Sequence, residues 1–275
     1  MNLKKIKFGI IGGGVMGEVL IKSLRQELKI SGQNILVMDL HTVRRNSLTR
    51  KYQVKNTKEY NDIINNSKII FLAVKPQQFK QVASQLTKRL SKDRIIISIM
   101  AGITLAGIKK RLSHQQVVRT MPNMAAQIGS GITLWMADKS VKQSDRKIIK
   151  DVITSFGMEI EVDSDKKIDA LTLVTGCGPA YLLHLSGILE DFTKQQGIKS
   201  IQAKKIVTEM MAGALVLYLQ SNKDTKDLIN NMSSKGGVTE AVFDILSKKN
   251  KSEKIWQNAF KNALKRTSII SKKYE

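Results

Sequence analysis

The chain has 275 residues, enough for one large domain or two modest ones, and its 42% content of hydrophobic residues predicts a globular protein. The longest apolar runs, 69–74 and 212–219, are far shorter than the roughly 20 residues that a membrane-spanning helix needs, so we expect no membrane span. A single cysteine, Cys177, excludes an internal disulfide and leaves no cluster for a metal, so we expect a cytoplasmic protein without a metal site.

Lysine and arginine outnumber aspartate and glutamate by 46 to 23, which gives a formal net charge of +23. A charge of this size raises the question of nucleic-acid binding. The basic residues are nevertheless dispersed in pairs such as Lys109-Lys110, and aromatic residues, at 5%, offer little material for base stacking. We therefore expect basic, solvated faces that attract anionic cofactors and substrates, and we do not expect nucleic acid as a partner.

In the first half of the chain, short apolar runs alternate with amphipathic stretches. Continuous apolar runs are typical of strands buried on both faces of a parallel sheet, and the amphipathic stretches predict helices such as 15–28, 77–90 and 144–156. The predicted strands, in chain order, are 6–11, 35–38, 69–74, 95–99, 117–121, 132–136 and 159–162. This alternation predicts an α/β fold with an N-terminal, Rossmann-like, doubly wound parallel sheet.

Beyond about Ser164 the strand pattern disappears and apolar residues recur at helical spacing. The stretches 182–192, 203–217 and 255–264 are apolar over more of their circumference than a small helical domain can bury. We therefore expect a homo-oligomer, a dimer at least, held together by these helices. The predicted organisation is a doubly wound domain over residues 1–163, followed by a C-terminal all-helical dimerisation domain over residues 164–275.

A glycine turn follows the first predicted strand and opens a helix. Gly12, Gly14 and Gly17 give the spacing Gly-x-Gly-x-x-Gly. Gly12 permits the tight turn, Gly14 leaves room for a pyrophosphate, and Gly17 lets helix and strand pack closely, with the helix N-terminus facing the phosphates. In this context the motif favours dinucleotide binding over a plain glycine turn.

Two features after the second predicted strand bear on the choice of dinucleotide. Asp39 lies about 20 residues beyond the last glycine, where an acidic side chain holds ribose hydroxyls and repels a 2′-phosphate, which favours NADH. Arg44 and Arg45 follow within one turn and can pair with that same phosphate, which favours NADPH. The sequence therefore leaves both cofactors open.

Three prolines and a second glycine loop mark further candidate positions. Pro76 and Pro122 follow predicted strands, at the sheet edge where α/β folds bind ligands, and Pro179 suits the first turn of a helix. All three also fit simple end-capping. The segment 233–239 precedes an amphipathic helix, so its backbone N–H groups can bind an anion such as a carboxylate, although a plain helix N-cap is the simpler explanation.

Five short segments, in one order and spacing, carry a family resemblance: 9–16, 72–76, 118–123, 176–181 and 233–239. On these segments the sequence resembles the pyrroline-5-carboxylate reductases along essentially its whole length. The last segment matches the family signature, where the substrate carboxylate and ring nitrogen are held. The chain departs from the family pattern at Lys235 (usually proline), Cys177 (usually serine), Met124-Ala125 (often Thr-Pro) and Gly13 (often alanine). None of these departures removes a group assigned to the chemistry.

The resemblance implies a reductase that uses NADPH or NADH to reduce the C=N bond of 1-pyrroline-5-carboxylate, giving L-proline in the last step of proline biosynthesis. The substrate arrives partly protonated on nitrogen, so catalysis is mainly orientation and electrostatics, without a side-chain base. The resemblance makes Ser234 and Thr239 the catalytic residues, with Thr239 bonded to the imine nitrogen. It also implies that dimers assemble further into rings.

Two sets of site residues follow. The resemblance places the substrate against Ser234, Gly236, Gly237, Val238 and Thr239. With Gly17 and Asp39 added from the glycine-turn argument, the expected cofactor-binding residues are Ile11, Gly12, Gly13, Gly14, Val15, Met16, Gly17, Asp39, Ala73, Val74, Lys75, Pro76, Ala101 and Gly102.

Two other classes of function remain as alternatives. A 3-hydroxyacid dehydrogenase also joins a Rossmann domain to a helical one, but it uses a Lys-x-x-Asn helix motif that this chain lacks after Glu161. A non-enzymatic dinucleotide-sensing or nucleic-acid-associated protein would exploit the charge of +23. It would bind DNA with a steep salt dependence and show no turnover.

Overall fold

The computed structural model describes residues 3–247 and 251–274. Contacts within the chain divide it into two units. The first unit combines Met1–Cys177 with Ala263–Glu275, and the second is Gly178–Asn262. The first unit therefore includes the first helix after the sheet and the last part of the chain.

The first unit is built on an eight-stranded sheet with the order β3-β2-β1-β4-β5-β6-β7-β8. Strands β1 to β6 run parallel, in the arrangement of a doubly wound dinucleotide-binding fold. The strand order reverses between β1 and β4, and ligands of such folds bind at this point, beyond the carboxyl ends of the strands. The strands are β1 (Phe8–Ile11), β2 (Ile35–Met38), β3 (Lys55–Thr57), β4 (Ile69–Leu72), β5 (Ile95–Ser98), β6 (Val117–Pro122), β7 (Gly131–Ala137) and β8 (Gly157–Glu161).

The last two strands depart from the expected parallel sheet. β7 pairs antiparallel with β6, and β8 pairs parallel with β7. Only the short 3-10 helix η5 (Met124–Ile128) lies between β6 and β7, whereas a parallel pair needs a crossover of about a dozen residues or more. The expectation of a parallel sheet is therefore correct for β1 to β6 and wrong for β7 and β8.

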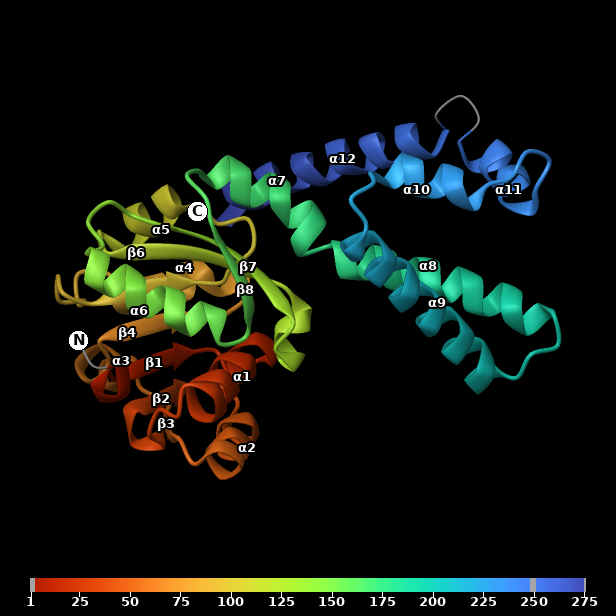
Figure 1. Ribbon diagram of the computed structural model, residues 1–275. Coiled ribbons are helices and arrows are strands. Elements are labelled where there is room, and N and C mark those ends of the chain that lie inside the picture. The colour runs from red at the N-terminus through yellow and green to blue at the C-terminus, as the bar shows by residue number, and fades with distance from the viewer. Residues whose placement is uncertain (1–2, 248–250, 275) are drawn as a thin grey trace. The chain divides into compact units, whose positions relative to one another are not determined.

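Helices cover both faces of the sheet (Figure 1). Successive strand residues point to opposite faces, so that Ile10 packs in one core cluster and Ile11 in the other. Burial on both faces explains why the strands are continuously apolar. One face carries α1 (Val15–Lys22), α2 (Thr42–Tyr52) and α6 (Gln143–Thr154), and the other carries α3 (Tyr60–Asn66), α4 (Phe79–Leu86) and α5 (Leu105–Leu112).

A buried ion cluster ties α7 (Asp165–Thr175) to the sheet. The guanidinium of Arg119, on β6, is 1% exposed and donates to Asp165 Oδ1 at 2.5 Å and to a carboxylate oxygen of Asp169. Asp165 also accepts the N–H of Leu105, in the first turn of α5, at 2.9 Å. Because a buried charge needs close partners, this cluster fixes α7 against β6 and α5.

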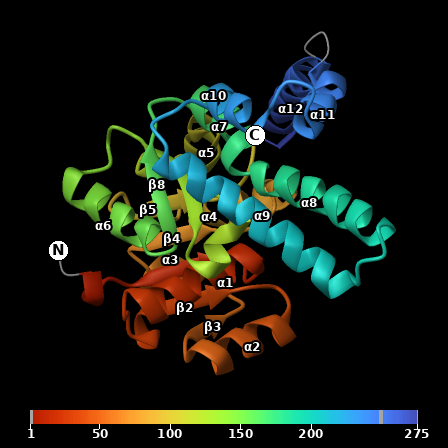
Figure 2. The same ribbon diagram turned by 45° about the vertical axis from the view of Figure 1, so that its right-hand side comes forward.

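The second unit is helical, as expected for this part of the chain. Helices α8 and α9 lie side by side in both views (Figure 1 and Figure 2). The ring of Tyr181 meets that of Trp256 edge-on with centroids 5.1 Å apart, and Phe260 lies beside both rings. Pro179 lies in the first turn of α8, where its missing N–H costs no hydrogen bond. The remaining helices are α8 (Gly178–Gln195), α9 (Ser200–Gln220), α10 (Thr225–Met232), α11 (Val238–Leu246) and α12 (Lys251–Tyr274).

Large apolar side chains are exposed along these helices, among them Leu183, Ile201 and Leu219, which are 72%, 86% and 80% exposed. Among the described residues, one helical stretch, Asp165–Gln195, has the length and hydropathy to cross a membrane, and only 6% of its apolar window is buried. A single such stretch does not distinguish a membrane from a protein partner. Exposed apolar surface of this extent is also typical of subunit interfaces.

Candidate active site

The glycine turn lies at the carboxyl end of β1, next to β4. The Gly12 N–H donates to the Met38 carbonyl at 2.8 Å, and Gly12 has a φ of +104°, which side chains rarely tolerate. A Cβ on Gly12 would lie 2.4 Å from the Ala73 carbonyl oxygen, and one on Gly17 would lie 2.0 Å from the Gly12 carbonyl oxygen. Both glycines are therefore required by close backbone packing.

Gly14 is glycine for a different reason. It is the N-cap of α1, with a φ of −64° that any residue adopts, and a Cβ there would meet no atom of the described residues within 4 Å. No side chain caps this end of α1, so its first backbone N–H groups face open space. A helix N-terminus with free donors and an unfilled space in front of it fits a pyrophosphate group.

Asp39 closes the turn from the end of β2. Its Oδ2 accepts the N–H of Gly13 at 2.7 Å, and its Oδ1 accepts the N–H of His41 at 2.8 Å. Each carboxylate oxygen keeps a further lone pair, so Asp39 can still accept hydrogen bonds from ribose hydroxyls.

Glu18, on α1, joins the glycine turn to α2. Its Oε2 accepts from Arg44 at 2.5 Å, and its Oε1 accepts from Lys51 at 2.8 Å and from Tyr52 at 2.9 Å. Arg44 also donates its Nε–H to the carbonyl of Gly13. Partial burial alone would raise the pKa of Glu18, but the hydrogen bonds from Lys51, Arg44 and Tyr52 lower that pKa from 4.5 to about 2. Glu18 is therefore a fixed anion.

The second arginine of the pair is largely buried. Arg45 is 8% exposed and donates to the Asp39 carbonyl and, at 3.1 Å, to the hydroxyl of Thr42. Its hydrogen bonds hold the β2–α2 connection in place, and both members of the Arg44-Arg45 pair are thus engaged with the protein.

A cavity of about 270 Å³ opens in front of this turn. Seven expected cofactor residues line it: Ile11, Gly12, Gly14, Asp39, Ala73, Val74 and Lys75. The other lining residues were not among those expected from the sequence; they are Met38, Leu40, His41, Tyr60, Gln78, Gln81 and Val82. Tyr60 and Gln81 come from α3 and α4, and no motif marks them, because only the fold brings these helices to the end of the strands.

The other expected cofactor residues lie around the cavity without lining it. Gly13 is buried beneath Asp39, and Met16 packs against the core. Pro76 begins the 3-10 helix η4 (Pro76–Gln78) after β4. Ala101 and Gly102 follow β5, and a Cβ on Gly102, whose φ is +74°, would lie 2.7 Å from Ile270 Cγ2. Val15 opens α1 with half of its surface exposed, and Gly17 lies one turn further on.

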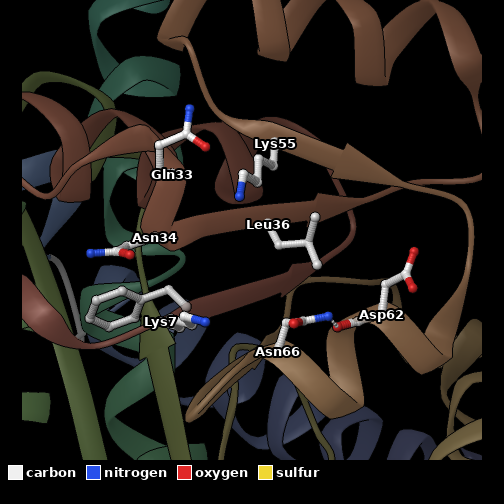
Figure 3. A pocket seen from close by; sticks show the side chains of 8 residues that line it. Lys7, Gln33, Asn34, Leu36, Lys55, Asp62 and Asn66 are labelled. Carbon is white, nitrogen blue, oxygen red and sulfur yellow. Dashed lines mark hydrogen bonds between the residues drawn. The ribbon is translucent and has the colours of Figure 1, made fainter.

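A larger hollow, of about 400 Å³, lies at the opposite, amino edge of the sheet. Figure 3 shows Gln33 and Lys55 on one side of it and Asp62 and Asn66, from α3, on the other. It lies at the beginning of β1, β2 and β3, so the length of the strands separates it from the glycine turn. It is no part of the candidate dinucleotide site.

The expected substrate residues share the turn that enters α11. The Gly237 N–H donates to the Ser234 carbonyl at 2.8 Å, and Gly236 has a φ of +72°. Gly237 is the N-cap of α11, and no side chain caps the helix. Ser234 is exposed, Thr239 is partly buried and Val238 is 85% exposed. The turn therefore presents backbone N–H groups and hydroxyls at one helix end.

One side chain already engages this turn. Glu240, in the first turn of α11, accepts the N–H of Gly236 at 2.5 Å. A carboxylate on this N–H is the arrangement that an anionic ligand would also use. The interaction shows that the turn can hold a carboxylate oxygen on its backbone.

The strand order, the glycine turn and the open N-terminus of α1 define a dinucleotide-binding protein. Residues 7–102 match the family described as NADP oxidoreductase coenzyme F420-dependent, and residues 165–269 match Pyrroline-5-carboxylate reductase dimerisation. The chain is 32% identical over 243 residues to the pyrroline-5-carboxylate reductase of Synechocystis sp.. The matched residues make up 88% of this chain and 90% of that protein. It belongs to the pyrroline-5-carboxylate reductase family.

Solved structures agree with this assignment. A 1-pyrroline-5-carboxylate reductase from Streptococcus pyogenes has a TM-score of 0.84 and 26% identity, covering 96% of this chain and 98% of the other. The NADP-bound pyrroline carboxylate reductase of Plasmodium falciparum has a TM-score of 0.88 at 24% identity, covering 98% and 100%, and bears on the fold alone. The dimerisation match confirms the expected homo-oligomerisation. Nothing in these comparisons favours a 3-hydroxyacid dehydrogenase or a sensor.

Proposed function

We propose that this chain reduces the C=N bond of 1-pyrroline-5-carboxylate to L-proline, the last step of proline biosynthesis, with NADH or NADPH as the reductant. One observation carries the proposal within this family. Gly14 has an ordinary φ and, within the part of the chain that the structure describes, no neighbour that a Cβ would strike, so a ligand in front of α1 explains this glycine.

The glycine turn and the cavity hold the dinucleotide. The N–H groups at the start of α1 bind its pyrophosphate, and Asp39 accepts hydrogen bonds from the adenosine ribose. Ala73, Val74 and Lys75 line its cavity, Pro76 follows them at the start of η4, and Ala101 and Gly102 follow the neighbouring strand β5. Bound in this way, the nicotinamide ring supplies the hydride.

The turn before α11 holds the substrate. The backbone N–H of Val238 and the Ser234 hydroxyl bind the carboxylate, and the Gly236 N–H joins them when the substrate carboxylate takes the place of Glu240. Gly237 closes this turn through its hydrogen bond to the Ser234 carbonyl. The Thr239 hydroxyl accepts a hydrogen bond from the protonated ring nitrogen and so orients the electrophilic carbon. Because that nitrogen carries its proton before the hydride arrives, no side chain has to act as an acid during the transfer.

We further propose that dimers of the chain assemble into rings and that the protein works in the cytoplasm. The exposed apolar side chains of α8 and α9, such as Leu183 and Leu219, support contacts beyond one chain. A single cysteine, with no disulfide partner, suits a reducing compartment.

The test is steady-state oxidation of NADH and of NADPH, followed by absorbance, with and without 1-pyrroline-5-carboxylate. We expect oxidation that depends on the imine and saturates with it. A folded protein that binds dinucleotide but oxidises it at the same rate with and without the imine would refute the proposal.

A further inference from the structure

Charges of opposite sign meet beside the place proposed for the adenosine ribose. NADPH differs from NADH by one phosphate on that ribose. A free guanidinium attracts such a phosphate, and a fixed carboxylate repels it. The preference of this site therefore depends on how firmly the protein holds Asp39, Arg44 and Arg45.

Asp39 is held in place on both oxygens. Its carboxylate accepts one N–H from the glycine turn, at 2.7 Å, and one from His41, at 2.8 Å. A carboxylate tied by two backbone donors cannot swing away from an incoming anion. It keeps lone pairs for ribose hydroxyls, so it favours a ribose without a phosphate.

Arg44 is the more exposed of the two arginines that follow Asp39, and Glu18 restrains it. Its side chain remains 33% exposed, so it is accessible to a ligand. Its Nε, however, donates to the Gly13 carbonyl, and its terminal nitrogen donates to Glu18 at 2.5 Å. Lys51 and Tyr52 fix the other oxygen of Glu18, so the anion that holds Arg44 is itself rigid.

Arg45 cannot replace Arg44 as the partner of a 2′-phosphate. It is 8% exposed, and its guanidinium is used by the Asp39 carbonyl and the Thr42 hydroxyl. Turning it toward a phosphate would break hydrogen bonds that shape the β2–α2 connection.

From these contacts we infer that Glu18 makes the site select NADH over NADPH by holding Arg44 on the glycine turn. The inference rests on the proposed function in that it assumes dinucleotide binding at this turn. Glu18 acts as a positioning residue, since it contacts Arg44 and is not among the residues that line the cavity. A chain without the Glu18 carboxylate leaves Arg44 able to pair with a 2′-phosphate, and NADPH gains affinity.

The test measures dissociation constants of NADH and NADPH for the full-length protein by titration calorimetry, without any imine substrate. We expect the unaltered protein to bind NADH at least about tenfold more tightly, which corresponds to about 1.4 kcal/mol or more. Glu18→Gln should tighten NADPH binding about tenfold and leave NADH binding within about twofold.

Matched variants separate release of Arg44 from a general change of charge. The double variant Glu18→Gln with Arg44→Gln should lose the gain for NADPH. Lys51→Gln removes another partner of Glu18 but leaves Arg44 held, so it should leave the preference unchanged. Arg44→Gln alone should also keep the original preference, which gives a readout that does not depend on the folding of Glu18→Gln.

Three outcomes would overturn the inference. These are equal or tighter binding of NADPH by the unaltered protein, an equal change for both dinucleotides in Glu18→Gln, and a gain for NADPH that survives removal of Arg44. If the dissociation constants follow the expected pattern but the protein does not reduce the imine, the proposed function is wrong and this inference still holds. Failure to bind either dinucleotide would contradict both.

Discussion

The Glu18 carboxylate receives three hydrogen bonds, from Arg44, Lys51 and Tyr52, and links α1 to α2. Because its pKa falls from 4.5 to about 2, the folded state binds this proton less readily than the unfolded chain. Its contribution to stability is therefore complete above pH 4.5 and disappears as the pH falls toward 2.

Glu18→Gln should lower the free energy of unfolding at neutral pH by about 1–2 kcal/mol, after allowance for solvent screening of a partly exposed cluster. The difference between the two proteins should shrink as the pH is lowered from 4.5 toward 2. Urea unfolding across this range measures it. A difference that stays constant with pH would show that the carboxylate's charge contributes nothing.

Thr239→Ala should lower turnover of 1-pyrroline-5-carboxylate about thirtyfold, because a hydrogen bond to a charged donor is worth about 2 kcal/mol. The dissociation constant for the dinucleotide should stay the same. Thr239→Ser, which keeps the hydroxyl, should retain most of the activity. Equal loss of dinucleotide affinity in the alanine variant would contradict this division of roles.

Single residues could be predicted where the chemistry is local in sequence. The reasons for glycine at positions 12 and 17 follow from a turn of six residues, and each has its structural counterpart, whereas the pyrophosphate expected in front of Gly14 stays a prediction. The engagement of Arg44 by Glu18 could not be predicted in this way, since 26 residues separate the two and no motif links them. The same holds for Tyr60, which reaches the cavity from another helix.

At the scale of elements, the glycine turn offers a matched pair of substitutions. Gly17→Ala places a Cβ 2.0 Å from the Gly12 carbonyl oxygen, so it should shift or unfold the turn and lower the melting temperature. Gly14→Ala meets no protein atom and should leave the melting temperature unchanged while weakening dinucleotide binding at least tenfold, by about 1.4 kcal/mol or more. Thermal unfolding and calorimetric titration of both variants provide the comparison.

Unchanged dinucleotide binding by Gly14→Ala would contradict the proposed position of the pyrophosphate. If Gly14→Ala bound NADH and NADPH as tightly as the unaltered chain, the pyrophosphate would not lie in front of α1. The position of the dinucleotide in the proposal would then be wrong, whatever the fate of Gly17→Ala.

The ion cluster between β6 and α7 should be important for stability. Arg119→Leu leaves the carboxylates of Asp165 and Asp169 without their cation and should cost about 3–5 kcal/mol of unfolding free energy. Asp169→Asn keeps the pair of Arg119 with Asp165 and should cost less. Urea unfolding at one fixed protein concentration tests this ranking, and an Arg119→Leu protein of undiminished stability would contradict it.

Strands with a continuous apolar run could be predicted from the sequence, whereas the short edge strand β3 and the direction of β7 and β8 could not. β1, β2, β4, β5 and β6 are buried on both faces, and all five were predicted. β3 was missed because only Thr57 of its three residues is buried and it pairs on one side, at the sheet edge. The direction of β7 depends on the short connection between β6 and β7, and the spacing of apolar residues does not indicate the direction of a strand.

At the scale of the whole molecule, the apolar second half and the charge of +23 act against each other. Burial of residues such as Leu183, Ile201 and Leu219 drives association, and like charges on each copy oppose it. High salt screens the repulsion and leaves apolar contacts intact.

Light scattering after size exclusion should therefore find a dimer or a larger assembly in low salt. High salt should strengthen the assembly or leave it unchanged. A folded monomer, or an assembly that dissociates as salt is raised, would contradict an interface made by the apolar helices.

The central claim is that a hydride passes from the dinucleotide to the imine carbon. It is tested most directly by supplying NADH deuterated at the transferable position of its nicotinamide ring together with 1-pyrroline-5-carboxylate, and by examining the product by mass spectrometry. We predict L-proline with a single deuterium on the ring carbon next to nitrogen that does not carry the carboxylate. Proline without deuterium, or oxidised dinucleotide without proline, would contradict the account.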